Sequence, residues 1–409
     1  MSLHSTKKAL PILFLTILLD MIGIGMIIPI LPIIFTDPTS PSFLLQGYSS
    51  QMQFIIAGLV TALAGIMTFF AAPILGELSD LYGRKKLLTI CIGILAVSQI
   101  FFGLGILLSS LWLLFISRAI GGLAGANISI AQASIADVTE PKNRAKNFGL
   151  IGVAVGIGFI LGPALGGILA SVTHSASIPF FVAGLFGLIN LLSVRFLLPE
   201  THTIPESKLH TITIFKALHN IKRAFIGKDA SHIYISNFSY YIGFTFFTSF
   251  TGMFLVQKFA MSSGGLGTYF GALGFWIIIT QGFILRIITK KYNEQQILRY
   301  SLVAVACAIM VMPLMSSLFM VYLLLPFICI PQGLSMANMS ALISKSVSKD
   351  KQGAAMGINA SLSSLASGIV PALAGGSTAL LGISFPYILA GLFILFSWQN
   401  LFLRKRFTL

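Results

Sequence analysis

Long apolar stretches alternate with short polar ones along almost the whole chain. Each stretch holds about 20 residues or more, the length that a helix needs to cross a hydrocarbon core of about 30 Å. Because the stretches are continuously apolar, they indicate membrane-spanning helices and not the alternating strands of a membrane β-barrel. We predict spans at residues 9–35, 51–75, 87–108, 111–135, 147–170, 178–198, 231–257, 265–288, 297–315, 318–343, 353–381 and 384–403.

The longest polar segment, residues 199–230, divides these twelve spans into two groups of six. The predicted organisation is a six-helix bundle at 1–198, a linker at 199–230 and a second six-helix bundle at 231–409. Apolar residues recur at helical spacing within the linker, beside basic ones. This pattern predicts an amphipathic helix that lies on the membrane surface.

The two groups of spans carry similar short sequences in the same order. "GLAGANIS" (122–129) is followed by "NFGLIG" and "GPALGG", and "GLSMANMS" (333–340) is followed by "AAMGIN" and "VPALAGG". Spans 4 and 5 therefore correspond to spans 10 and 11. A shift by six spans keeps the orientation, so the chain is predicted to hold two parallel six-helix repeats, an architecture typical of transporters.

The basic residues lie on one side of the predicted membrane. Hydrophobic residues make up 56% of the 409 positions and charged residues 9%, which excludes a soluble domain of this size. The net charge of +15 comes from clusters between the spans that form no single basic face, so nucleic acid is not an expected partner. The clusters occupy both termini and the even-numbered loops, whereas the opposite loops hold only Lys258. Both termini are therefore predicted to be cytoplasmic.

No pattern in the chain indicates an enzyme, a cofactor or a metal site. The three cysteines lie in apolar runs, and the six histidines lie in loops or at span ends without metal-ligand spacing. The Gly-Lys pair in "IGKDA" follows no glycine-rich phosphate loop, which excludes an ATP-driven pump. Three classes remain open: a secondary active exporter, a proton symporter or uniporter of a metabolite, and a non-transporting membrane sensor or scaffold.

The stretch "GELSDLYGRKK" (76–86) forms the short loop between spans 2 and 3. Gly76 and Gly83 allow the chain to reverse tightly, Asp80 can face a helix N-terminus, and Arg84 stands where cytoplasmic cations belong. A loop that only sets the topology would explain the basic residues equally well.

Span 5 contains glycines at intervals of four residues, in "GFILGPALGG". Such spacing makes a smooth ridge along which another helix can approach closely. The proline withdraws a helix hydrogen bond and is expected to bend the helix. The predicted packing motif consists of Gly158, Gly162, Pro163, Gly166 and Gly167.

Together these motifs resemble the major facilitator superfamily. "GELSDLYGRKK" is similar to its signature loop, "GFILGPALGG" to the span-5 motif of its proton-driven antiporters, and "RAIGGLAGA" (118–126) to their span-4 motif. "LLDMIGIGMIIPILP" and "SIADVTEPKNRAKNFG" resemble the tetracycline-resistance branch of the drug:proton antiporters. Leu81 departs from the arginine usual in the loop. Ser98 and Gln99 stand in span 3, where tetracycline pumps carry a carboxylate.

The resemblance implies the major facilitator fold and export of an amphipathic small molecule or drug by alternating access. It also implies a proton gradient as the driving force in place of a cofactor, a bacterial inner membrane and a monomer. The expected partners are the substrate, protons and the lipid bilayer. A cytoplasmic gate is implied at Gly76, Asp80, Gly83, Arg84 and Asp137.

Asp20 and Arg118 are ionisable residues deep within predicted spans. A helical rise of 1.5 Å per residue places Asp20 about 18 Å from the cytoplasmic entry and Arg118 about 10 Å from the outer end, so their depths nearly coincide. They could form a structural ion pair that locks two helices. The preferred hypothesis is a proton-coupling site, because burial disfavours the charged carboxylate and a nearby guanidinium favours it.

Other polar and aromatic residues within the spans are candidates for the substrate site. Amides and aromatic rings together suit an amphipathic or lipophilic substrate, although each alone is more often an interhelical contact. The predicted set is Asn127, Gln132, Asn237, Tyr241, Phe244, Trp276, Gln281, Gln332, Asn338 and Asn359.

Overall fold

The structure, a computed structural model, describes residues 3–139, 144–201, 231–347 and 352–403. The amphipathic helix predicted within the linker lies outside these ranges. The described residues form helices and no strand, and 11 of the segments are long and apolar enough to cross a membrane. The prediction of an all-α membrane protein is confirmed.

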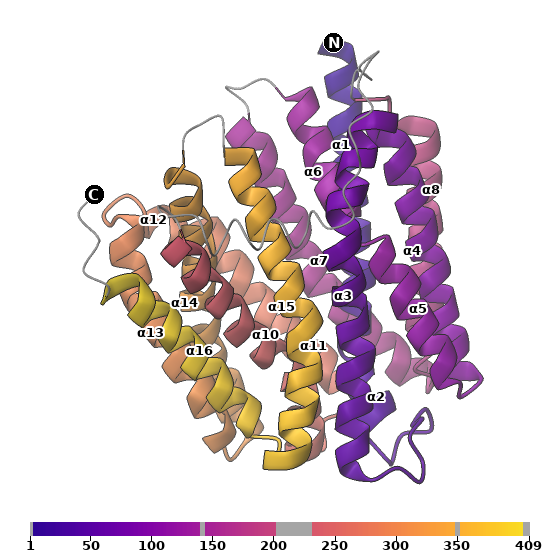
Figure 1. The fold of residues 1–409 in the computed structure, drawn as a ribbon. Helices are drawn as coiled ribbons and strands as arrows, with labels where there is room; N and C mark the ends of the chain where they lie inside the picture. Colours follow the sequence, from indigo (N-terminus) through magenta and orange to yellow (C-terminus); the bar gives the residue numbers. More distant parts are fainter. Residues whose placement is uncertain (1–2, 140–143, 202–230, 348–351, 404–409) are drawn as a thin grey trace. The chain divides into compact units, whose positions relative to one another are not determined.

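The first part of the chain contains the predicted spans 1 to 6, two of them split into shorter helices (Figure 1). The helices are α1 (Leu3–Ile27), α2 (Ile30–Thr36), α3 (Ser50–Tyr82), α4 (Arg84–Leu107), α5 (Leu111–Leu123), α6 (Asn127–Val138), α7 (Arg144–Thr173) and α8 (Ile178–Leu197).

The second part contains the predicted spans 7 to 12. Span 7 corresponds to α10, which is 29 residues long, contains several polar side chains and is not one of these 11 segments. The elements are α10 (Ser231–Phe259), α11 (Ser263–Ile279), the π-helix η2 (Thr280–Ile284), α12 (Leu285–Ile288), α13 (Glu294–Val311), the 3₁₀-helix η3 (Met312–Leu314), α14 (Leu318–Lys345), α15 (Gln352–Leu381) and α16 (Phe385–Phe402).

The fourth predicted span is broken at residues 124–126, between α5 and α6. The backbone N–H of Gly125 bonds to the carbonyl of Gly122 at 3.1 Å in a tight turn, and Thr68 of α3 donates its hydroxyl to the same carbonyl at 3.0 Å. These bonds occupy a carbonyl that the break removes from the helix. As a result, Asn127 is the first residue of α6.

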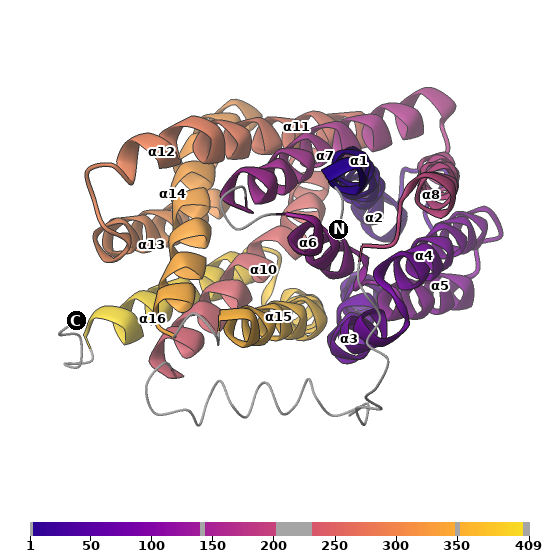
Figure 2. The same cartoon turned by 90° about the horizontal axis from the view of Figure 1, so that it is seen from above.

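The chain forms two compact units. One draws on residues 1–46, 67–216 and 261–274, and the other on 47–66, 217–260 and 275–409, so that α3 and α11 contribute to both. In the first unit α1 packs against α7 and α8, and α4 against α5 and α8 (Figure 2). In the second, α10 packs against α15 and α16, and α13 against α14 and α16. The division at 1–198, 199–230 and 231–409 stays a prediction.

The glycine ridge of α7 lies against α1. A Cβ atom added at Gly162 would stand 2.7 Å from the Cα atom of Gly25, and one added at Gly158 would collide with Met21. Gly166 meets the backbone of the next turn of α1 in the same way. The two helices therefore touch backbone to backbone in the segment that follows Asp20.

The other two residues of this motif have different neighbours. A Cβ atom added at Gly167 would stand 2.9 Å from the Cα atom of Gly267 in α11, a contact within the first unit. Pro163 does not end α7, which continues from Arg144 to Thr173. Its ring packs beside Gly25.

Candidate functional site

Asp20 of α1 is bound by two buried amides, Asn127 of α6 and Asn190 of α8. The Nδ2 group of Asn127 donates to Oδ2 of Asp20, and the Nδ2 group of Asn190 donates to Oδ1 at 3.2 Å. The two asparagines are 2% and 0% exposed. Each carboxylate oxygen therefore has a neutral donor, in a position where an isolated charge would be costly.

Asn190 was not among the predicted site residues. It lies in "LFGLINLLSV" (185–194), where the amide is the only strongly polar group apart from one serine. A single amide in a transmembrane helix is a recognisable signal, because it needs a partner inside the protein. The sequence does not show which partner it has. The structure also places Asn127, predicted to line the substrate site, on Asp20.

Arg118 of α5 is held by aromatic rings. Its guanidinium carbon lies 4.4 Å from the ring centroid of Phe102, which stacks on Phe180 at 4.4 Å. Its Nε atom is buried without a hydrogen-bond partner among the described residues. No ion pair within that part of the chain joins Arg118 to Asp20. A similar depth in the membrane thus does not bring the two charges into contact.

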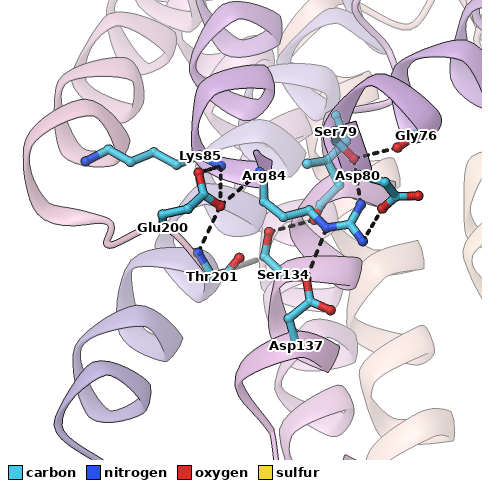
Figure 3. Close-up of polar contacts among 10 residues, drawn as sticks. Gly76, Ser79, Asp80, Arg84, Lys85, Ser134, Asp137, Glu200 and Thr201 are labelled. Carbon is cyan, nitrogen blue, oxygen red and sulfur yellow. Dashed lines mark hydrogen bonds and ion pairs between the residues drawn. The ribbon is translucent and has the colours of Figure 1, made fainter. Parts of the chain in front are cut away.

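The charged residues predicted to form a gate lie together at the start of α4 (Figure 3). Arg84 pairs with Asp80 at 2.5 Å and with Asp137 of α6 at 3.1 Å, and it donates to the hydroxyl of Ser79 at 2.6 Å. The arginine is only 9% exposed. This one side chain therefore connects the ends of α3, α4 and α6. Gly76 lies inside α3, where its carbonyl accepts a bond from Ser79 at 2.7 Å.

Glu200, which follows α8, completes this cluster and was not predicted. Its carboxylate accepts bonds from the backbone N–H groups of Arg84 at 3.0 Å and Lys85 at 3.3 Å (Figure 3). These groups belong to the first turn of α4, which has no partner for them within the helix, and the helix dipole there favours a negative charge. Gly83 has φ +96°, and a Cβ atom at this position would stand 2.5 Å from Oε2 of Glu200.

In the second unit, three of the predicted substrate residues form one hydrogen-bonded chain. Asn237 of α10 donates to Oδ1 of Asn359 in α15, and Asn359 donates to the hydroxyl of Tyr241 at 3.4 Å. Asn237 is 1% exposed and Asn359 is 6% exposed. The chain joins α10 to α15 through neutral groups alone.

A second polar cluster connects α10, η2 and α14. Tyr240 donates its hydroxyl to the carbonyl of Gln332 at 3.2 Å, and Gln281 donates from Nε2 to the carbonyl of Gly333 at 3.2 Å. Gln281 lies in the π-helical turn η2, a local widening that often marks functional positions. From this turn the Gln281 amide reaches the backbone of α14.

The remaining predicted substrate residues are dispersed. Phe244 stacks on Tyr240 with 6.3 Å between ring centroids, and Asn338 donates to a carbonyl of its own helix at 2.8 Å. Trp276 of α11 and Gln132 of α6 are half-buried. Among the described residues, no group of three or more His, Cys, Asp and Glu side chains could hold a metal ion.

Comparison with known proteins gives one family and a group of bacterial relatives. The model of the Major Facilitator Superfamily matches residues 13–371 and 233–407. Tetracycline resistance protein, class H, of Pasteurella multocida is 29% identical over 90% of this chain and 88% of its own length. Multidrug resistance protein 1 of Bacillus subtilis is 29% identical over 93% of this chain and 92% of its own.

Solved structures of low sequence identity share the fold. The human organic anion transporter MFSD10 (TETRAN) superposes with a TM-score of 0.72 at 22% identity, covering 97% of this chain and 99% of its own. A D-xylose-proton symporter superposes with a TM-score of 0.72 at 16% identity, covering 96% of each chain. The expectation of twelve helices in this fold is confirmed.

Proposed function

The chain belongs to the Major Facilitator Superfamily, and we propose that it exports amphipathic small molecules in exchange for protons. It is a multi-pass membrane transporter of the inner membrane and not an enzyme. The relatives named for tetracycline and multidrug resistance support the direction of transport and the substrate class. They do not favour a metabolite symporter or a sensor. Protons as coupling ion and a monomer as the working form are part of this proposal.

The observation that carries the proposal is the position of Asp20. A carboxylate within a membrane span is expensive, and such residues usually serve transport. Its partners Asn127 and Asn190 are neutral, and within the described part of the chain no ion pair holds Asp20 permanently ionised. The carboxyl group can therefore exist in both protonation states.

Protonation changes the hydrogen bonds that Asp20 can make with its partners. The carboxylate accepts a bond from each amide, whereas the acid carries an O–H donor on one oxygen. One amide must then turn its own oxygen toward the acid or lose the bond. Since Asn127 belongs to α6 and Asn190 to α8, binding a proton alters the contacts of α1 with both helices.

Arg118 is proposed as the second coupling residue. Its contact with the Phe102 ring leaves the N–H groups of the guanidinium able to bind an oxygen ligand, and its Nε atom is buried without a partner in the described part of the chain. A buried guanidinium in this condition is costly, which favours binding of an acceptor during the transport cycle.

The substrate is proposed to contact the polar groups of the second unit. The chain of Asn237, Asn359 and Tyr241 offers amide and phenol groups, and Phe244 adds an aromatic surface. These neutral groups can exchange partners with a bound molecule at small electrostatic cost. They suit a substrate with an aromatic body and several hydrogen-bonding groups.

The cluster around Arg84 is proposed as the cytoplasmic gate. Its pairs with Asp80 and Asp137 join three helix ends and stabilise one arrangement of the first unit. Opening of the gate requires these pairs to separate.

Transport by purified protein in proteoliposomes tests the proposal. A pH gradient is imposed in Na⁺-free medium, and movement of a panel of lipophilic drugs is followed. Asp20→Asn, which keeps the shape and removes the titratable group, should abolish gradient-driven transport while the protein stays folded, since an amide cannot take up and release the coupling proton. Asp37→Asn is the control, because the Asp37 carboxylate accepts its hydrogen bonds from Thr39 of its own exposed loop. Coupled transport by Asp20→Asn at the normal rate would contradict the proposal.

A further inference from the structure

Two buried oxygen atoms beside Asp20 have no hydrogen-bond partner among the described residues. They are Oγ1 of Thr16, one helical turn before Asp20, and Oδ1 of Asn190. Both side chains are 0% exposed. Buried polar atoms are nearly always bonded, so two orphaned acceptors on the residues that flank Asp20 indicate that these residues can bind a further ligand. The proton does not account for them, because Asp20 alone can hold it.

The spacing of the surrounding oxygens suits a cation. The Nδ2 atom of Asn190 lies 3.2 Å from Oδ1 of Asp20 and 3.4 Å from the carbonyl oxygen of Thr16. A half-turn of the amide puts Oδ1 of Asn190 in that place, since the two ends of the group have nearly the same shape. Oδ1 of Asn190 would then stand about 3.2 Å from Oδ1 of Asp20 and about 3.4 Å from the carbonyl oxygen of Thr16, the residue that also carries the orphaned hydroxyl.

Separations of 3.2 and 3.4 Å between neighbouring oxygen ligands fit a cation of the size of sodium and not of magnesium. Two oxygens held at right angles at about 2.3–2.4 Å from a cation lie about 3.3–3.4 Å apart, whereas the distances of about 2.0–2.1 Å that Mg²⁺ demands bring them to about 2.9 Å. Sodium has the larger of these two sizes. Oxygen ligands without sulfur or imidazole also favour a hard cation over a transition metal.

The charge of the site favours a monovalent ion. Asp20 supplies one negative charge, and the other ligands of Thr16 and Asn190 are neutral. A divalent ion would leave an uncompensated charge in a region of low dielectric constant. Among the described residues no salt bridge involves Asp20, and Arg118 lies against the Phe102 ring.

We propose that Thr16, Asp20 and Asn190 form a sodium site, so that Na⁺ competes with the proton for the coupling carboxylate. The inference rests on the proposed function, in which Asp20 is the coupling group, and adds a second coupling ion to it. Either ion neutralises Asp20. Sodium additionally turns the Asn190 amide and binds the Thr16 hydroxyl, so it ties α1 to α8 more firmly than the proton does.

Thermal unfolding of the purified full chain in detergent tests this inference. NaCl is titrated against KCl and choline chloride at constant ionic strength, because a ligand that binds only the folded state stabilises it in a saturable manner. We expect a saturable rise of Tm with Na⁺ alone, and a half-saturating Na⁺ concentration that increases as the pH falls. An equal effect of all three salts would overturn the sodium site.

Variants separate the ligands from general packing. Thr16→Val keeps the volume and removes the hydroxyl, and should raise the half-saturating NaCl concentration about tenfold or more, at least the effect of losing an outer-shell partner. Thr36→Val is the control, since the buried Thr36 bonds to the carbonyl of Pro32 at 2.8 Å and should keep the Na⁺ response. Asp20→Asn should lose it. A full response in Thr16→Val would contradict the inference.

A second variant keeps the test decisive if Thr16→Val does not fold. Asn190→Leu removes the amide and should abolish the Na⁺ response in the same measurement; its persistence would overturn the site. The pH-gradient assay in Na⁺-free medium answers a different question. Proton-driven transport without any Na⁺ effect on Tm would refute the sodium site and leave the proposed function intact. Na⁺ stabilisation without proton-driven transport would refute proton coupling alone.

Discussion

Glu200 accepts a hydrogen bond from the backbone N–H of Arg84 at 3.0 Å, although 116 positions separate the two residues. The carboxylate thus caps α4 from the segment that follows α8. The side chain of Arg84 meanwhile binds Asp80 and Asp137. The main chain and the side chain of one arginine are therefore fixed by three carboxylates.

Replacing Glu200 should loosen this cluster. Glu200→Ala leaves the N–H groups of Arg84 and Lys85 without their acceptor, and loss of a helix cap typically costs about 0.5–2 kcal/mol. Glu200→Gln retains one carbonyl acceptor and should give an intermediate value. Denaturant unfolding in detergent measures both. Equal stability of wild type and Glu200→Ala would show that the cap contributes nothing.

Gly83→Ala should destabilise the same region for a different reason. Its φ of +96° is strained for any residue with a side chain, at about 1–3 kcal/mol, and the new methyl group would stand 2.5 Å from Oε2 of Glu200. Gly76→Ala is the matched control, because Gly76 lies inside α3 with no atom within 4 Å of an added Cβ. Unfolding of the two variants side by side gives the comparison. A similar loss in both would rule out the backbone explanation.

The contact between α1 and α7 should not tolerate a methyl group. At Gly162 an added Cβ atom stands 2.7 Å from the backbone of α1, which cannot move aside as a flexible side chain could. Overpacking of this kind costs about 1–3 kcal/mol, so Gly162→Ala should unfold more easily and transport more slowly. Gly152→Ala, in the same helix with open space around it, should be neutral. Equal stability and equal transport rates of the two variants would show that the close approach of α1 and α7 contributes nothing to stability.

The membrane helices could be predicted well from the sequence, and their rotation could not. Runs of apolar residues set the number and order of the spans because crossing a membrane requires them. The same runs do not fix which face of a helix meets which neighbour. A similar depth allowed Asp20 and Arg118 to meet without requiring it, and the structure places Arg118 against the ring of Phe102. The break before Asn127 turns α6 so that the amide reaches Asp20.

The partners of residues such as Glu200, which follows a span, could not be predicted from the sequence either. Glu200 stands beyond the last apolar residue of α8, and nothing in its local sequence indicates the N-terminus of α4 as its partner. Asn190 had a local signal, an amide in an apolar run, but the aspartate that it binds lies 170 positions away. Motifs within one short loop, such as Asp80 with Arg84 four positions later, could be predicted because neighbouring residues of a short loop stay close together.

The ring beneath Arg118 should matter for transport and stability. Phe102→Leu removes the aromatic face at 4.4 Å from the guanidinium while keeping an apolar side chain, and a desolvated cation–π contact contributes about 2 kcal/mol. We expect unfolding at lower denaturant concentration and slower proton-driven transport. Phe101→Leu is the control, because the adjacent ring is only half-buried and has no cation–π contact with Arg118. Unchanged unfolding and transport in Phe102→Leu would show that the ring beneath Arg118 contributes to neither.

Asn359 and Asn400 allow substrate recognition to be separated from structure in the second unit. Both are buried amides that join α10 to a later helix: Asn359 bonds to Tyr241 at 3.4 Å, and Asn400 bonds to the carbonyl of His232 at 2.9 Å. Either change to alanine leaves a buried polar partner unsatisfied, at about 1–3 kcal/mol of stability. Only Asn359 belongs to the proposed substrate surface. Asn359→Ala should therefore raise KM and alter the relative transport rates of different drugs. Asn400→Ala should lower the amount of folded protein without changing the order of drug preference. Transport rates across the drug panel, divided by the amount of folded protein, separate a role in substrate recognition from a role in stability. An unchanged drug preference in Asn359→Ala would exclude this amide from the substrate site.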